Sequence, residues 1–119
     1  MNLLELLRWQ WGGYSRAHGN PMNLWLHIFT APFFWIGTVF LVMALFKLSW
    51  SLLLLGFGFI LVTLIAQGRG HKMEVNPPAP FTSPWNFVAR LFMEQWITFP
   101  RFVLSGSWAR NLAAGRDGR

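Results

Sequence analysis

The sequence contains no cysteine and little charge, and both absences restrict the class of protein. Without cysteine, neither a disulfide nor a thiolate metal site is available to the chain. Only 12% of the 119 residues are charged, against about 25% in an ordinary soluble domain. The apolar share is 54%, more than the core of so small a soluble domain can bury. The composition therefore predicts a single membrane domain over residues 1–119.

Two long uncharged runs dominate the chain. Residues 22–46 and residues 48–66 contain no Asp, Glu, Lys or Arg, and runs of 25 and 19 residues are long enough to cross a bilayer as helices. Asn20 followed by Pro21 is a typical helix start, because asparagine caps free amides and proline suits the first turn. We expect a first span over residues 21–47 and a second span with its extension over residues 49–75.

The flanking segments predict helices that lie at the membrane surface. Residues 2–13 form a short amphipathic segment, whereas residues 84–105 mix apolar and charged side chains and are too polar for a third span. A disordered tail is expected over residues 112–119. The predicted fold is an all-α membrane protein, a two-span transmembrane helical hairpin with flanking amphipathic interfacial helices.

The basic residues indicate a partner and an orientation. The chain has ten Lys and Arg and a formal charge of +6, but these residues are scattered, which argues against nucleic acid and favours anionic membrane lipid. Only Lys47 lies between the two uncharged runs. By the positive-inside rule both termini lie in the cytoplasm, and we expect an integral protein of a bacterial inner membrane.

The three histidines are placed where a hairpin would bring them together. If the hairpin turn is centred between residues 48 and 49, His27 precedes it by about as many residues as His71 follows it, and the mismatch is about 1.5 Å of helix rise. His18 lies in the loop before the first span, at the same end. Glu74 follows His71 by three residues and shares its face if the helix continues. Three imidazoles and a carboxylate are a donor set for a borderline metal such as Fe(II) or Zn(II).

Each histidine also has a simple structural interpretation. His27 can bond a backbone carbonyl freed by a helix kink at Pro32. His71 can be solvated in a basic segment, and His18 lies in a loop of glycine, asparagine and proline. The residues therefore leave open a hairpin that binds or shapes lipid without chemistry, a haem protein and a zinc hydrolase.

Two motifs bracket the predicted hairpin. They read Tyr14-x-x-x-His18-x-Asn20-Pro21-x-Asn23-x-x-x-His27 and Gly70-His71-x-x-Glu74-x-Asn76-x-Pro78-Ala79. Together they resemble the opening and closing motifs of the membrane 2-hydroxy fatty acid dioxygenases of fungal α-oxidation and their bacterial relatives. The resemblance extends over residues 14–79 and includes every histidine of the chain.

The resemblance implies an Fe(II)-dependent dioxygenase that uses O₂ to shorten a 2-hydroxy fatty acid by one carbon. By this resemblance His18, His27 and His71 would be iron ligands. Glu74 would be the catalytic carboxylate, either as a fourth ligand or as a partner that orients a histidine.

The same resemblance implies how the substrate binds. Tyr14, Asn23 and Arg69 are the expected substrate-binding residues, with a basic side chain neutralising the carboxylate. The acyl chain would lie along the hairpin beside residues 33–35. Two spans bury little protein surface, so a homodimer is compatible with the sequence, although no residue pattern specifies one.

Overall fold

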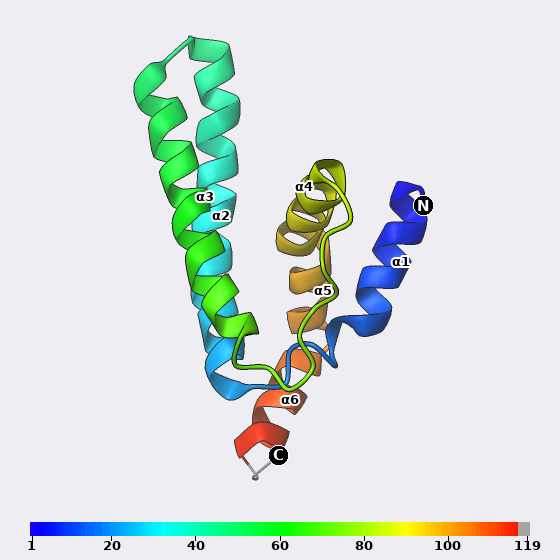
Figure 1. The fold of residues 1–119 in the computed structure, drawn as a ribbon. Helices are drawn as coiled ribbons and strands as arrows, with labels where there is room; N and C mark the ends of the chain where they lie inside the picture. The colour runs from blue at the N-terminus through cyan, green and yellow to red at the C-terminus, as the bar shows by residue number, and fades with distance from the viewer. Residues whose placement is uncertain (117–119) are drawn as a thin grey trace.

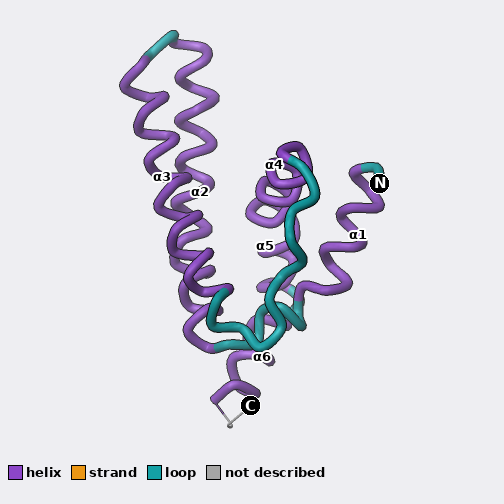
Figure 2. The backbone as a smooth tube through the Cα atoms, in the orientation of Figure 1, coloured by secondary structure: helices purple, strands orange, loops and turns teal. Residues whose placement is uncertain are grey.

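The computed structural model describes residues 1–116, and its regular elements over that range are helices (Figures 1 and 2). Two long helices form one arm of a V, and the remaining helices form the other arm and the base. In chain order the elements are α1 (Leu3–Tyr14), α2 (Pro21–Lys47), α3 (Trp50–His71), α4 (Pro84–Met93), the π-helical turn η1 (Glu94–Thr98), α5 (Phe99–Leu104) and α6 (Ser107–Arg116).

Helices α2 and α3 lie side by side and run in opposite directions (Figure 1). The Asn20 side chain caps α2 by accepting from the Asn23 N–H, with Pro21 in the first turn. At the far end the chain reverses over two residues: Leu48 adopts a left-handed conformation with φ of 49°, and the Ser49 side chain caps α3. A reversal this short forces the two helices to be neighbours.

Small residues let the two long helices approach closely. A Cβ atom added to Gly37 would lie 2.8 Å from the backbone oxygen of Gly56, so a larger residue has no room there. Close backbone approach at glycine is typical of helix pairs in membranes. The outward faces expose large apolar side chains, and both helices are long and apolar enough to cross a membrane.

The second long helix ends earlier than the expected extension to residue 75. Helix α3 stops at His71, and the chain then turns, with the Met73 N–H bonded to Gly70 O and the Glu74 N–H to His71 O. After this turn the Glu74 carboxylate accepts hydrogen bonds from the backbone N–H groups of Gly19 and Asn20, in the loop before α2.

The segment expected to lie flat at the interface packs against the other helices. Helices α4, η1 and α5 follow one another end to end in the other arm of the V (Figure 1), and η1 contacts α2. Phe92 contacts Phe34 of α2 edge-to-face at 4.9 Å, and on the other side Gln10 of α1 donates to Arg90 O. Phe102 is fully buried. This segment therefore closes a core with its buried face, and the expectation that it lies at a membrane surface stays a prediction.

Helix α6 occupies part of the expected tail. Leu112 is buried in the core, and the Asn111 side chain donates to His18 O at 2.9 Å and to Ser15 O at 3.0 Å. These contacts make residues 112–116 helical, contrary to the expected disorder. Residues 117–119 of that segment lie outside the described residues.

Candidate metal centre

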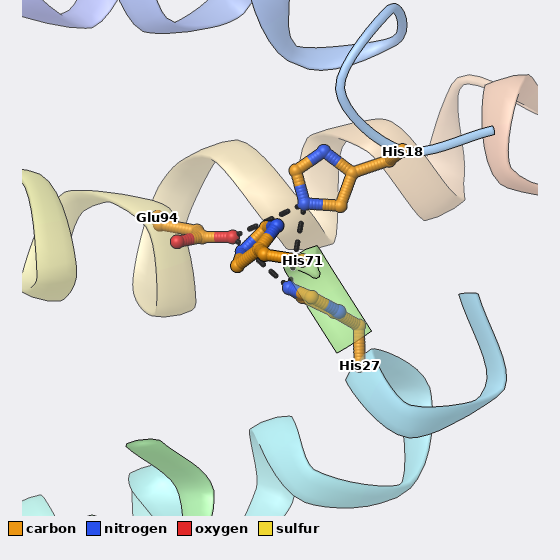
Figure 3. Close-up of side chains that lie close together, drawn as sticks. All are labelled: His18, His27, His71 and Glu94. Carbon is orange, nitrogen blue, oxygen red and sulfur yellow. Dashed lines mark hydrogen bonds and ion pairs between the residues drawn. The ribbon is translucent and has the colours of Figure 1, made fainter. Parts of the chain in front are cut away.

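Four side chains from four parts of the chain converge at the base of the V (Figure 3). His18 comes from the loop between α1 and α2, His27 from the second turn of α2, His71 from the end of α3, and Glu94 from the start of η1. One potential ligand atom from each lies within 4.8 Å of the others. His18 and His27 are almost completely buried.

The distances within the cluster match those between ligands of a single metal ion. His18 Nε2 lies 3.3 Å from His27 Nε2, and these two atoms lie 3.5 and 3.4 Å from Glu94 Oε2. Two ligand atoms bound at about 2.1 Å to one ion are about 3.0–3.4 Å apart at octahedral to tetrahedral angles. His18, His27 and Glu94 therefore have the spacing that ligands of one divalent metal require, and His71 completes the group within 4.8 Å.

The tautomers of the imidazoles also fit a cation. His18 Nδ1 lies 2.8 Å from Tyr14 O, and His27 Nδ1 lies 3.0 Å from Asn23 O. Because a carbonyl oxygen cannot donate, both Nδ1 atoms carry the proton, and in the neutral rings both Nε2 lone pairs face the centre of the cluster. A hydrogen bond from the second ring nitrogen to a carbonyl is the usual arrangement around a ligating histidine. In addition, His71 Nδ1 is buried and makes no hydrogen bond.

Burial favours the neutral form of the His18 imidazole. It lowers the pKa of His18 from its ordinary value. Because a metal ion binds a deprotonated imidazole nitrogen, this ring is in the form that binds metal.

Tyr14 supports both the carboxylate and one histidine. Its hydroxyl donates to Glu94 Oε2 at 2.7 Å, and its ring stacks on the His18 imidazole with centroids 3.8 Å apart. Burial and the neighbouring Glu94 raise the pKa of Tyr14 well above its ordinary value, so the hydroxyl stays a donor. Tyr14, expected to bind substrate, lies close enough to the cluster to hold Glu94 and His18 in place.

Glu74 lies outside the cluster. Its carboxylate accepts hydrogen bonds from the Gly19 N–H at 2.9 Å, the Asn20 N–H at 3.0 Å and the Asn23 side-chain amide. It thereby ties the end of α3 to the loop that carries His18. The face shared with His71 required a continuing helix, and α3 ends at His71.

The carboxylate in the cluster is Glu94, which the sequence motifs did not single out. It belongs to the segment expected to lie at the interface, where a single acidic residue among apolar ones is ordinary. The available signal was composition: only four acidic residues occur in the chain, and Glu94 is followed by apolar and neutral residues up to Pro100.

The other two expected substrate residues lie away from the cavity. Asn23 is fully buried, and its side chain faces Glu74. Arg69 is exposed and is not among the residues that line the cavity described next.

A pocket of about 940 Å³ opens onto the cluster between α1, α3, α4 and the loop before α4. His18, His71 and Glu94 form part of its wall. The rest is mainly apolar, with three arginines; these lining residues include Leu64, Phe81, Phe87, Leu91, Arg8, Arg16 and Arg90. Residues 33–35, beside which the acyl chain was expected, do not line this pocket, and Phe34 is fully buried against Phe92.

The comparisons with known proteins agree with the motifs. No match was found among curated proteins or among solved structures. Residues 4–102 match the model of a family described as 2-hydroxy-palmitic acid dioxygenase Mpo1-like. Since this match covers most of the 119 residues, including all four residues of the cluster, the chain belongs to the Mpo1-like family of 2-hydroxy-palmitic acid dioxygenases.

Proposed function

We propose that this protein is an Fe(II)-dependent dioxygenase that shortens 2-hydroxy fatty acids by one carbon. The observation that carries the proposal is the convergence of three imidazole nitrogens and one carboxylate oxygen within 4.8 Å at the wall of a largely apolar pocket. Three histidines and one carboxylate suit Fe(II) and leave coordination positions for substrate and O₂. The family's printed description, a 2-hydroxy-palmitic acid dioxygenase, supports the substrate class.

In this proposal His18, His27, His71 and Glu94 hold the metal. Bound Fe(II) would supply the activation of O₂, the oxidant, for cleavage of the bond between C1 and C2 of the substrate. The chain's own residues prepare that site: the carbonyls of Tyr14 and Asn23 orient two imidazoles, and the Tyr14 hydroxyl orients Glu94.

The pocket lining is suited to a molecule with an anionic head and a hydrocarbon chain. Arg16 lines it and takes the role expected of Arg69, which does not line it. The Arg90 guanidinium, by contrast, already donates to Ala79 O and Pro80 O. Apolar surface for the acyl chain comes from Leu64, Phe87 and Leu91. We propose Arg16 as the cation that neutralises the carboxylate of the substrate.

We further propose that α2 and α3 form a transmembrane hairpin with both termini in the cytoplasm of a bacterial inner membrane. Side chains such as Phe46, Leu54 and Leu45 are at least 70% exposed on these helices, and lipid would cover them. The cluster lies at the end of the hairpin away from its two-residue turn, near the loop before α2 and the loop after α3. A substrate that resides in the bilayer would reach it without crossing the membrane.

Metal content tests the proposal directly. Full-length protein purified anaerobically in detergent is analysed by mass spectrometry for bound metals, with His27→Ala and Glu94→Gln as variants. We expect near-stoichiometric iron in the wild type, loss of it in both variants, and oxygen uptake with 2-hydroxypalmitate but not with palmitate. Zinc without oxygen uptake would favour a hydrolase on the same ligands. Absence of metal even after reconstitution with Fe(II) would leave a hairpin that binds or shapes lipid.

A further inference from the structure

Glu94 begins a π-helical turn that widens the helix between α4 and α5. In this turn the Phe99 N–H donates to Glu94 O, five residues back. The Gln95 carbonyl is then left without a helical partner, because the Phe99 N–H is already used and Pro100, the next residue, has no N–H. Such π turns are rare in proteins and frequently occur at functional sites.

The Gln95 carbonyl receives its hydrogen bond from another helix. Trp35 Nε1 donates to it at 2.7 Å, which satisfies an otherwise unpaired buried acceptor. Trp35 follows His27 by eight residues, which places the two side chains about 80° apart around α2 and about two turns apart along it. The helix that supplies one histidine of the cluster thus also holds the backbone next to Glu94.

The side chain of Gln95 is hydrogen-bonded to the other long helix, α3. It is fully buried and exchanges two hydrogen bonds with Gln67 of α3, at 3.1 and 2.7 Å. Gln67 precedes His71 by four residues, on the same face of α3. The residue next to Glu94 is therefore hydrogen-bonded to both of the long helices that carry histidines of the cluster.

The wider turn also determines which side chains share a face with Glu94. In a regular α-helix, residues five apart lie about 140° apart around the axis. Nevertheless Glu94 and Phe99 both contact His27: Glu94 Oε2 lies 3.4 Å from its Nε2, and the Phe99 ring centroid lies 5.8 Å from that of the imidazole. The extra residue in the π turn brings the two side chains to one side of the helix.

We infer that Trp35 and Pro100 are positioning residues that maintain this π turn and thereby aim the Glu94 carboxylate at the three imidazoles. The inference rests on the proposed metal site. Without the indole donor, the Gln95 carbonyl is satisfied most simply when the Phe99 N–H moves to it from Glu94 O. That exchange converts the π turn into a regular α turn and rotates Glu94 away from the cluster.

Cobalt(II) binding tests the inference, because the visible absorption of bound Co(II) reports on its ligands independently of catalysis. Anaerobic full-length protein in detergent is titrated with Co(II), comparing Trp35→Phe with the matched control Trp96→Phe, whose indole donates at 3.3 Å to the Thr38 side chain instead. We expect Trp35→Phe to weaken Co(II) binding about tenfold and to alter the spectrum of the loaded protein. Trp96→Phe should change neither.

A second variant, Pro100→Ala, tests the same π turn without removing any packing around the indole. Pro100→Ala adds an N–H that can bond to Trp96 O in a regular α turn, so we expect an altered Co(II) spectrum with no loss of helix content by circular dichroism. Wild-type spectra at saturation in both Trp35→Phe and Pro100→Ala would overturn the inference, even if either variant were less stable. Failure of the wild type itself to bind Co(II) or Fe(II) would instead refute the proposed metal site and the inference with it.

Discussion

Replacing Glu94 by glutamine separates metal binding from folding. The side chain keeps its shape, and the amide oxygen can still accept the 2.7 Å hydrogen bond from Tyr14. The substitution also removes the negative charge of a side chain that is 15% exposed. Because shape and the Tyr14 hydrogen bond are kept, we expect the free energy of unfolding of the metal-free protein to change by less than about 1 kcal/mol. The charged oxygen donor to the metal, however, is lost.

The size of the metal effect follows from linkage between binding and folding. A ligand present at 100 times its Kd stabilises the folded state by about 2.7 kcal/mol. If Glu94→Gln weakens binding by about 100-fold, about 2.3 kcal/mol of that stabilisation is lost at the same metal concentration and about 0.4 kcal/mol remains. Thermal unfolding of detergent-solubilised protein with and without Co(II) under anaerobic conditions measures both quantities.

Glu74→Gln is the matched control, because it changes the carboxylate that the sequence motif favoured. One amide oxygen cannot replace both carboxylate oxygens toward Gly19, Asn20 and Asn23, and we expect a loss of about 1–3 kcal/mol with or without metal. The stabilisation produced by Co(II) should largely remain. If Glu74→Gln abolished that stabilisation while Glu94→Gln preserved it, the assignment of Glu94 as the fourth donor would be refuted.

Three further substitutions test the packing and the pocket. Gly37→Ala should cost about 1–3 kcal/mol in thermal unfolding because its Cβ would lie 2.8 Å from a backbone oxygen of α3, whereas Gly58→Ala, with open space around it, should cost less than 0.5 kcal/mol or so; equal effects would contradict the close helix contact. Leu91→Trp should fill part of the pocket and raise KM for 2-hydroxypalmitate several-fold at unchanged iron content, and an unchanged KM would place the acyl chain elsewhere. Asn111→Leu should destabilise the protein by about 1–3 kcal/mol, since it leaves the carbonyl of His18 without its 2.9 Å donor; a neutral result would mean that α6 does not support the loop carrying that histidine.

The parts of the fold that follow local rules were accessible from the sequence. Two uncharged runs separated by a short polar turn predict two long apolar helices, and α2 and α3 occupy those runs. Counting residues from the turn predicts that His27 and His71 lie at one level, and the structure brings their imidazoles to 4.8 Å between centroids. Helix rise is constant, so this register requires no knowledge of packing.

Which glutamate joins the three histidines could not be predicted from helix rise. The prediction of Glu74 required the second helix to continue past His71. Instead, the Glu74 carboxylate accepts hydrogen bonds from the amides just before α2, which lie more than 50 positions earlier in the chain. Glu94 reaches the cluster only because a later segment packs beside α2. A hydrophobic pattern with a few charges does not distinguish a helix that lies on a membrane surface from one that packs against other helices, because both bury one apolar face.

By itself, then, the sequence determined the family motifs, the two apolar helices and the level at which the histidines meet, because composition, spacing and helix rise are local properties. The tertiary structure decided which carboxylate faces the imidazoles and where the pocket lies. It also decided that the Gln95 carbonyl, which has no helical donor because Pro100 lacks an N–H, accepts a hydrogen bond from Trp35, 60 residues before Gln95. These outcomes depend on contacts between segments far apart in the chain, which composition, spacing and helix rise do not specify.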